Sequence, residues 1–451
     1  MTTPLRAPSF PEQAVRARAR DGAAAVFPPR DAYGHVLFGA EPDGRNGDGD
    51  ALDTMRLVPP VFVPERLEKL VDLGREPLHS DVDLRTGIGG FTSQLPCYIS
   101  AFGSTQVASA GLGTAVATQA GRLGVPLVIG ENIAPMNGYG RIEDTAGRGL
   151  LDRIRAYADA VAPGTGGVVV QQSTEDADAE VWNLVYSDPG TLALLESGRL
   201  GFELKVGQGA KPGLGGITVV DRERAADLAG QFTVEPVYGA EAGDRLRFAT
   251  PGTFTSEILR QQIRLMRNNF PRARVWVKLI PGRDVADAAR VAWEAGADAV
   301  TVDGAEGGTG WAPTAALDGL GLPLGDCLRR IAEPAGCLLA SGRMWEGLRA
   351  VKCLALGARA VGFGRAALLA ADEDPEQGLE RLMEAFALES RLLISALGKY
   401  GTSALSPEDV WDPAPLDDLS TPFLNRSVSS HWRGETEAVK GEGVGGGRGR
   451  S

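Results

Sequence analysis

Eight short apolar runs recur along the chain, and their number and order restrict the fold more than any other feature of the sequence. Most are followed by an alanine-rich helical pattern that ends in glycine. Such runs are typical of strands buried on both faces, and connections with room for one helix imply parallel pairing. The runs are PCYISAF near 97, PLVIG near 126, GVVVQQ near 167, FELKV near 202, VWVKL near 275, AVTVDG near 299, CLLASG near 337 and AVGFG near 360.

Eight such units predict an α/β fold, a (β/α)8 TIM barrel with an N-terminal extension, a long insertion after strand 4 and a C-terminal helix. The insertion is the stretch from about residue 207 to 270. Gly357 is expected to follow the end of one helix, because glycine readily adopts the left-handed conformation there. A doubly wound open sheet is the alternative.

Composition divides the chain into four predicted parts. Residues 1–90 form an N-terminal extension, partly disordered, residues 91–372 the (β/α)8 barrel, residues 373–432 a C-terminal helical extension, and residues 433–451 a disordered tail. We expect a helix of the C-terminal extension to pack on the outside of the barrel. Its apolar residues at near-helical spacing are Leu379, Leu382, Phe386, Leu393 and Leu397.

Charge and cysteine content exclude several classes of protein. The net charge of -12 argues against a nucleic-acid partner. The four cysteines lie far apart without metal-type spacing, which favours a reducing compartment and argues against a metal site. No run approaches about 18 apolar residues, and the first residues lack the apolar core of a signal peptide. We therefore expect a cytoplasmic protein with no membrane partner.

Two turns of small residues follow the seventh and eighth predicted strands. A helix is expected to begin at each turn. Backbone N–H groups at a helix start bind anions, and barrels commonly hold a phosphate after these two strands. Ordinary turns with solvated arginines are the alternative. The residues predicted to bind phosphate are Ser341, Gly342, Arg343, Gly364 and Arg365.

The fifth and sixth strands also end in residues suited to a cofactor. Lys278 is expected at the C-terminal mouth of the barrel, where a lysine can hold negative charge that develops on a flavin ring. The segment VDGAEGGTG places Asp303, Gly307, Gly308 and Thr309 at the same rim, and its glycines allow a ring or phosphate to approach the backbone. A solvated lysine at a strand end is the alternative for Lys278.

Five motifs, in their order along the chain, resemble those of the FMN-binding synthase domain of glutamate synthase. The likeness extends from about residue 51 to 412. It is stronger to stand-alone glutamate-synthase-like subunits, including those of N-methylglutamate synthase. The resemblance implies FMN as the cofactor. The motifs are GENIAP, KVGQGAKPGLGG, VKL, DGAEGGTG, and ASGR with LALGARAVGFGRAAL.

The resemblance also implies roles for single residues. In the family, the loop beginning GQGAKPG passes over the flavin and takes part in binding a 2-oxo acid. By that likeness Lys205 and Gln208 hydrogen-bond the flavin or the substrate, and Lys211 binds a substrate carboxylate. Glu131 matches an acidic residue near which ammonia or an amine is bound, and Ser104 aligns with a serine close to FMN. Glu131, Lys211 and Gln208 are the predicted catalytic residues.

Departures from the family pattern alter the expected chemistry. The stretch after the last strand has no cysteines, so no iron–sulfur cluster is expected. Ile217 stands where the family has a glutamine that touches the oxo acid, and the amidotransferase domain is missing. Electrons would come from a substrate, a reduced nicotinamide or another protein, and nitrogen from a free amine or a partner subunit.

These observations predict an FMN-dependent oxidoreductase acting on a C–N bond, with CH–NH2 or CH–NH donors. Imine reduction or amine oxidation of an amino acid or related small carboxylate, in specialised biosynthesis, is the leading interpretation. The alternatives are a catalytic subunit of a multi-subunit N-methylglutamate or glutamate synthase-type enzyme, and a non-catalytic ligand-binding barrel. An electron-donor or amidotransferase partner protein and a homo-oligomer are left open.

Overall fold

A computed structural model describes most of the chain in one compact unit, Met1–Trp411. No helix within the described residues combines the length and apolar character needed to cross a membrane. The domain boundaries predicted from the sequence stay predictions. The described residues are 4–32, 35–37, 50–62, 76–102, 111–130, 144–174, 179–207, 217–230, 233–236, 243–248, 254–309 and 312–413.

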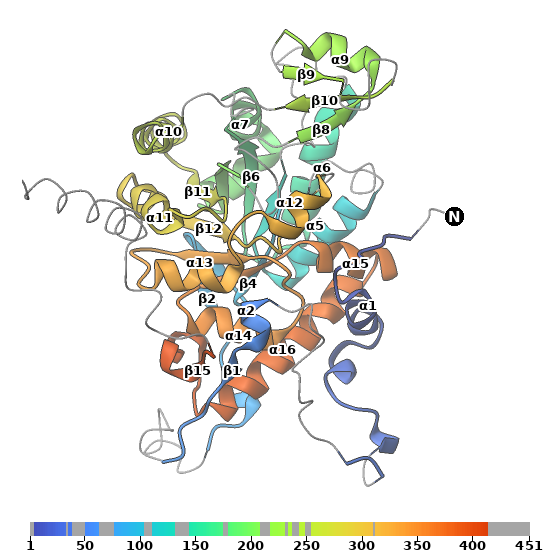
Figure 1. Ribbon diagram of the computed structural model, residues 1–451, viewed down its shortest axis with the longest axis vertical. Coiled ribbons are helices and arrows are strands. Elements are labelled where there is room, and N and C mark those ends of the chain that lie inside the picture. The colour runs from blue at the N-terminus through green and yellow to red at the C-terminus, as the bar shows by residue number, and fades with distance from the viewer. Residues whose placement is uncertain are drawn as a thin grey trace, which may run out of the picture. The chain divides into compact units, whose positions relative to one another are not determined.

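Eight parallel strands of the described chain close into a barrel (Figure 1). Each overlaps one of the predicted apolar runs, and the ladder closes where Val361 and Phe363 pair with Cys97 and Ile99. The closure confirms the TIM barrel and rules out the open sheet. The strands are β4 (Cys97–Ile99), β5 (Leu127–Ile129), β6 (Val168–Ser173), β7 (Leu200–Lys205), β11 (Arg274–Leu279), β12 (Ala299–Asp303), β13 (Leu338–Ser341) and β14 (Ala360–Phe363).

Helices connect consecutive strands. Their ends follow local signals: the Thr255 hydroxyl accepts a hydrogen bond from the Ile258 N–H at 3.2 Å at the start of α10 (Ser256–Asn269). Gly357 follows α14 (Gly347–Ala355) with a φ of 100°, as predicted. The other connecting helices are α5 (Gly113–Leu123), α6 (Asp144–Ala160), α7 (Ala179–Ser187), α8 (Leu192–Glu196), α11 (Val285–Glu294), α12 (Thr314–Gly319) and α13 (Leu324–Ile331), and α15 (Arg365–Glu373) follows the last barrel strand.

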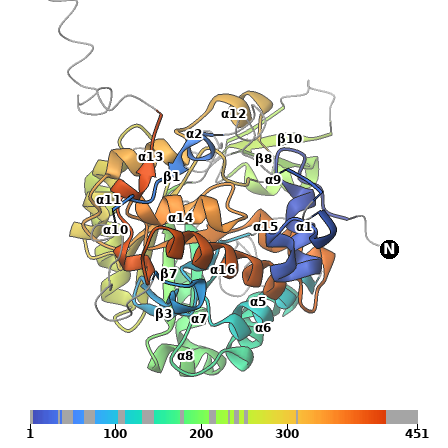
Figure 2. The ribbon, with the colours of Figure 1, turned by 90° about the horizontal axis from the view of Figure 1, so that it is seen from below.

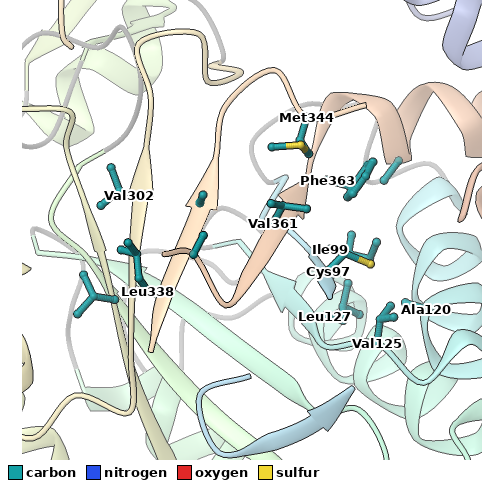
Figure 3. Close-up of a cluster of buried hydrophobic side chains, with 14 of the residues drawn as sticks. Cys97, Ile99, Ala120, Val125, Leu127, Val302, Leu338, Met344, Val361 and Phe363 are labelled. Atoms are coloured by element: carbon teal, nitrogen blue, oxygen red, sulfur yellow. The ribbon is translucent and has the colours of Figure 1, made fainter. Parts of the chain in front are cut away.

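The outward faces of the strands are apolar and pack against these helices. Figure 3 shows Ile99 of β4 and Leu127 of β5 close to Ala120 of α5, and all three side chains are buried. Phe363 of β14 belongs to the same cluster of buried hydrophobic side chains. Burial on both faces explains why the strands appear in the sequence as continuous apolar runs.

A hairpin of β2 (Thr86–Ile88) and β3 (Phe91–Ser93) fills the N-terminal end of the barrel. Ile88 and Phe91 are buried in one cluster with the lowest inward-facing barrel residues. A ligand of the barrel therefore has to enter from the C-terminal ends of the strands. The barrel residues of this cluster are Tyr98, Val128, Val169, Trp276, Ala299, Leu339 and Ala360.

The predicted insertion after the fourth strand forms its own small antiparallel sheet, in the order β8-β10-β9. Its strands are β8 (Ile217–Val220), β9 (Thr233–Glu235) and β10 (Arg245–Phe248), and α9 (Arg222–Leu228) lies between the first two in sequence. Figure 1 shows this sheet beyond the barrel strands, between β7 and α10 along the chain. The sequence predicted the insertion but not its sheet.

Segments from both ends of the chain pack on the outside of the barrel (Figure 2). The long helix α16 (Gly378–Ala396) buries Phe386, whose ring meets that of Phe363 edge to face at 5.2 Å. This confirms the expected C-terminal helix. The N-terminal helix α1 (Glu12–Asp21) is held against α15 by Arg16, which contacts Asp372 at 2.9 Å. The short strand β1 (Arg56–Leu57) pairs with β15 (Val410–Trp411), and α2 (Ala51–Thr54) precedes it.

The hairpin of β2 and β3, here called the plug hairpin because it fills the N-terminal end of the barrel, provides a test of the fold. Gly89 has a φ of 53°, and a Cβ there would lie 2.4 Å from the Trp276 ring nitrogen. Gly89→Ala should therefore lower the free energy of unfolding by about 3 kcal/mol, from backbone strain and overpacking together. Gly164→Ala is the matched control, because Gly164 has a φ of 78° with nothing within 4 Å of its Cβ position. It should cost about 1 kcal/mol. Equal urea midpoints for the two variants would contradict the proposed packing.

Candidate functional site

Polar side chains line the barrel above the apolar plug. Glu203 and Lys205 lie two residues apart on β7 and therefore on one face of that strand. Lys205 pairs in register with Ser173 of β6 on one side and with Lys278 of β11 on the other. All four residues are buried. The C-terminal half of the barrel interior is therefore polar and charged, in contrast to its base.

Lys278, Asp303 and Ser341 form one connected group on three neighbouring strands. The Lys278 ammonium lies 3.3 Å from a carboxylate oxygen of Asp303, and the Ser341 hydroxyl donates to the other oxygen at 2.6 Å. Gly307 covers this carboxylate so closely that a Cβ would lie 2.7 Å from it. Lys278 is only 7% exposed, so it is not a solvated lysine at a strand end. The sequence predicted all four residues as site residues, and the structure brings them together.

Glu203 is a buried carboxylate that the sequence reasoning did not assign to the site. It is 1% exposed, and it accepts hydrogen bonds from the Gln171 amide at 2.5 Å and the Thr301 hydroxyl at 3.2 Å. Burial raises the pKa of Glu203, while the positive charges of Lys278 and Lys205 act in the opposite direction. The available signal was the acidic residue of the run FELKV, two positions before Lys205 and therefore on the same strand face.

Two buried hydroxyl groups lie beside these charges without a hydrogen-bond partner in the described part of the chain. They belong to Tyr98 and Ser100, which are 2% and 6% exposed. Gly362 makes room for both, because a Cβ there would lie 2.2 Å from the Ser100 hydroxyl and 2.6 Å from that of Tyr98. Burial raises the pKa of Tyr98, and the charge of Glu203 adds to the effect. Buried hydroxyls normally find a partner, so this position suits a ligand or ordered water.

Arg365 follows β14 and begins α15. Its guanidinium donates to the backbone carbonyl of Glu306 and lies 4.6 Å from the ring centre of Phe10. Among the described residues it forms no ion pair. Burial lowers the pKa of Arg365, and the nearby charge of Arg343 contributes to this shift. Gly364 is the N-cap residue of α15, and as a glycine it has no side chain that could accept a hydrogen bond from the first N–H groups of the helix. A desolvated cation beside an open helix start is well suited to bind an anion.

The turn after β13 also has an unusual backbone. Gly342 has a φ of 132° and Arg343 a φ of 51°, which is rare for a residue with a side chain. The Arg343 guanidinium contacts Asp53 at 2.8 Å, so an N-terminal carboxylate holds it. A Cβ at Gly308 would lie 3.0 Å from the Arg365 side chain, which places this glycine beside that arginine.

The remaining predicted residues divide into two groups. Thr309 lies in the described loop after β12, next to Gly308. Ser104, Glu131, Gln208 and Lys211 lie outside the described residues, and their roles stay predictions. Within the described residues, no group of three or more His, Cys, Asp or Glu side chains is placed to hold a metal.

Comparisons with known proteins show which sequences this chain is similar to. The model of the family described as "Conserved region in glutamate synthase" matches residues 133–373, more than half of the chain. An archaeal-type glutamate synthase (NADPH) of Thermotoga neapolitana is 30% identical over 315 residues, which cover 65% of this chain and 57% of that protein. A glutamate synthase large subunit-like protein of Rhizobium meliloti is 29% identical, over 58% of this chain and 59% of that protein. The chain thus spans less than two thirds of each relative.

A solved structure shows the same fold. It is a soluble mutant of the membrane-associated (S)-mandelate dehydrogenase from Pseudomonas putida, with a TM-score of 0.52 and 21% sequence identity. The match covers 89% of this chain and 99% of that one. At this identity the likeness concerns the fold alone.

The buried ion pair provides a test of the site's internal charges. Asp303→Asn removes the nearest carboxylate from the buried Lys278 and should lower the free energy of unfolding by about 3 kcal/mol. Adding Lys278→Met should restore part of this loss, because the unpaired charge is then gone. Asp287→Asn is the control, since its pair with Arg290 is exposed and should contribute little. Urea unfolding measures all four proteins. A double variant no more stable than Asp303→Asn would show that Lys278 does not depend on Asp303.

Proposed function

This chain belongs to the family of the conserved glutamate synthase region, and from that premise we propose that it is an FMN-dependent oxidoreductase. The proposed reaction is imine reduction or amine oxidation at a C–N bond of an amino acid or related small carboxylate. Specialised biosynthesis is the proposed setting, because the glutamine that contacts the oxo acid in the family is replaced by Ile217. The glutamate synthase activity after which the relatives are named supports the oxidoreductase class but not this particular substrate.

The observation that carries the proposal is the set of buried cations at the one open end of the barrel. Lys205 and Lys278 are 8% and 7% exposed, and Arg365 is partly buried without a carboxylate partner in the described chain. Cations of this kind match an anionic, phosphate-bearing group. The unpartnered hydroxyls of Tyr98 and Ser100 add hydrogen-bonding capacity at the same end. The residues present therefore fit FMN.

Each group would have a distinct part in binding. Arg365 and the N–H groups at the start of α15 would hold the phosphate, together with the turn after β13. Lys278, fixed by Asp303, would hold positive charge next to the flavin ring. FMN, when bound, would supply the hydride chemistry at the C–N bond. The plug hairpin keeps solvent from entering through the opposite end of the barrel.

Substrate binding is assigned to residues outside the described chain. We propose that Lys211 orients the substrate carboxylate, that Gln208 hydrogen-bonds the flavin or substrate, and that Glu131 binds the amine and moves its proton. We further propose that Ser104 lies close to FMN and that no iron–sulfur cluster is present. The last cysteine, Cys353, precedes β14, so that thiolate ligands after the barrel are lacking. All four thiols are unpaired, as in a reducing, cytoplasmic setting.

A second candidate function is that of a catalytic subunit in a multi-subunit synthase. It is favoured by one observation, that the chain spans only 57% of the Thermotoga neapolitana relative. In that case an electron-donor or amidotransferase protein would complete the enzyme. Co-purification from native extract distinguishes the two candidate functions. A stoichiometric electron-donor or amidotransferase partner would support the function as a catalytic subunit. Full turnover by the purified chain with substrate and donor alone would exclude it.

The role of Lys278 can be measured on the bound cofactor. Lys278→Met should shift the midpoint potential of bound FMN to a more negative value by about 30–60 mV, because the cation stabilises the reduced, more negative flavin. Lys399→Met is the control, since Lys399 forms its 2.6 Å ion pair with Asp409 after α16, outside the barrel. Potentiometric titration followed by absorbance gives both values. An unchanged potential in Lys278→Met would place the lysine away from the ring.

The role of Lys211 can be separated from cofactor binding. After anaerobic photoreduction, a screen of 2-oxo acids with amines should reveal a pair that reoxidises the flavin of the wild-type protein. Lys211→Ala should abolish this reoxidation and leave FMN bound, because the lysine would contact the substrate and not the cofactor. Loss of the yellow colour in this variant would instead assign Lys211 to the flavin site.

A further inference from the structure

A buried network of charges joins the N-terminal segment to the turn after β13. Its centre is Arg349 of α14, which is 1% exposed. One guanidinium nitrogen donates to Asp50 at 2.8 Å and to Asp53 at 3.1 Å. Both carboxylates belong to the segment that caps and forms α2, almost 300 residues away along the sequence. Figures 1 and 2 both show α2 beside α13. A buried charge of this kind is retained only at a substantial cost in desolvation.

The network acts directly on the backbone of the turn. The second terminal nitrogen of Arg349 donates to the carbonyl of Gly342 at 3.3 Å. Because a trans peptide is planar, holding this carbonyl fixes the Arg343 N–H in the opposite direction. The carbonyl of Ser341 is held in the same way, by the Gly304 N–H at 2.8 Å. The N–H groups of Gly342 and Arg343 are thus oriented by groups that lie outside the turn.

Asp53 connects the two arginines of the network. One carboxylate oxygen contacts Arg349 at 3.1 Å, and the other contacts Arg343 at 2.8 Å. Arg343 is the residue with the left-handed φ of 51°. Successive N–H groups in such a turn form a concave site for anions. Asp53 is thus the one carboxylate that contacts both Arg343 and Arg349 among the described ion pairs.

We propose that the N-terminal segment of residues 50–54 positions the turn after β13 for a phosphate-bearing ligand, with Asp53 and Arg349 as positioning residues. The inference rests on the proposed function, because it takes the phosphate of FMN as the ligand. These residues do not touch the phosphate. They hold the Gly342–Arg343 backbone in the conformation that binds it, and they keep the Arg343 guanidinium in place beside Arg365.

The segment is anchored independently of these ion pairs. Leu52 is fully buried, and its carbonyl accepts a hydrogen bond from Lys352 at 2.6 Å. The Asp50 side chain caps α2 by accepting from the Leu52 N–H at 2.9 Å. Loss of the Asp53 carboxylate alone should therefore leave α2 docked. This makes Asp53→Asn a variant that changes the turn without removing the segment.

Glu306 adds a dependence on pH to the network. It lies 3.6 Å from Arg349 and accepts from the Leu324 N–H at 3.0 Å. Burial, and then the charge of Asp50, raises the pKa of Glu306 to about 8. Although burial opposes it, the Arg349 charge lowers the pKa of Asp50. The charged or titratable groups that face Glu306 are Asp50 at the start of α2, Cys327 of α13, Arg349 and Cys353 of α14, and Arg365 of α15.

The direction of the pH effect follows from these shifts. Below about pH 8, Glu306 holds its proton, so that of the carboxyl pair Glu306 and Asp50 only Asp50 is charged. As pH rises through this value, a second negative charge appears beside Asp50 and close to the turn. Binding of a phosphate should therefore weaken above about pH 8. The second proton of FMN phosphate is lost near pH 6, so a titration from pH 7 upwards reports on the protein.

The test compares FMN with riboflavin, which lacks the phosphate, on the full-length protein. Asp53→Asn should weaken FMN by about tenfold and riboflavin by less than about twofold, as measured by quenching of flavin fluorescence. Asp372→Asn is the matched control, because it removes an N-terminal ion pair with Arg16 on the outside of the barrel. It should change neither affinity. Thermal melting without ligand reports any general loss of stability in either variant.

Results for Asp53→Asn or for the wild type would overturn the inference, and the pH arm tests the role of Glu306 separately. If Asp53→Asn binds FMN as tightly as the wild type, or loses FMN and riboflavin equally, the segment does not position the phosphate turn. If the wild type binds neither flavin, the proposed function is wrong and the inference fails with it. In the pH arm, the ratio of FMN to riboflavin affinity should fall above about pH 8 in the wild type and stay flat in Glu306→Gln. An identical fall in both proteins would exclude Glu306 as the titrating group.

Discussion

The hydrogen-bonded closure between β14 and β4 is the constraint on which the other features depend. Once Val361 pairs with Cys97, every strand has two neighbours and its inward side chains face one enclosed interior. The hairpin around Gly89 then fills the lower part of this interior and leaves the upper part for polar groups. Chemistry can take place only where the carboxyl ends of the strands meet, because the other end is packed with aromatic and aliphatic side chains.

The polar interior is costly, and its arrangement shows how the cost is offset. Lys278 and Glu203 are removed from water, so each needs compensating charge or hydrogen bonds nearby. Asp303 and Ser341 supply them for the lysine, and Gln171 and Thr301 supply them for Glu203. The hydroxyl groups of Tyr98 and Ser100 have no such hydrogen bonds with the described residues. The charges of this interior are therefore satisfied while two of its buried hydroxyls are not, which is consistent with the ligand site that we propose.

The sequence predicted the barrel because continuous burial leaves a continuous apolar run for each strand. It also brought Lys278, Asp303 and Ser341 to one rim, since the ends of parallel strands meet at the same edge of a barrel. Glu203 was missed because its hydrogen-bond partners, Gln171 and Thr301, lie on other strands and no local spacing connects them. The Arg343–Asp53 contact was missed because its partners lie 290 residues apart and no local spacing connects them. The small sheet of the insertion has short strands with weak alternation, which local patterns do not detect.

The docking of α2 against α14 has a consequence for how the chain folds during synthesis. Asp50 and Asp53 leave the ribosome early, but Arg349 becomes available only after more than three quarters of the chain has been made. Until then both acids remain in water, and the turn that they later hold does not yet exist. Contacts of such long sequence separation form late and slowly. The turn after β13 is therefore among the last parts of the molecule to acquire its final shape, after the residues of α14 have emerged.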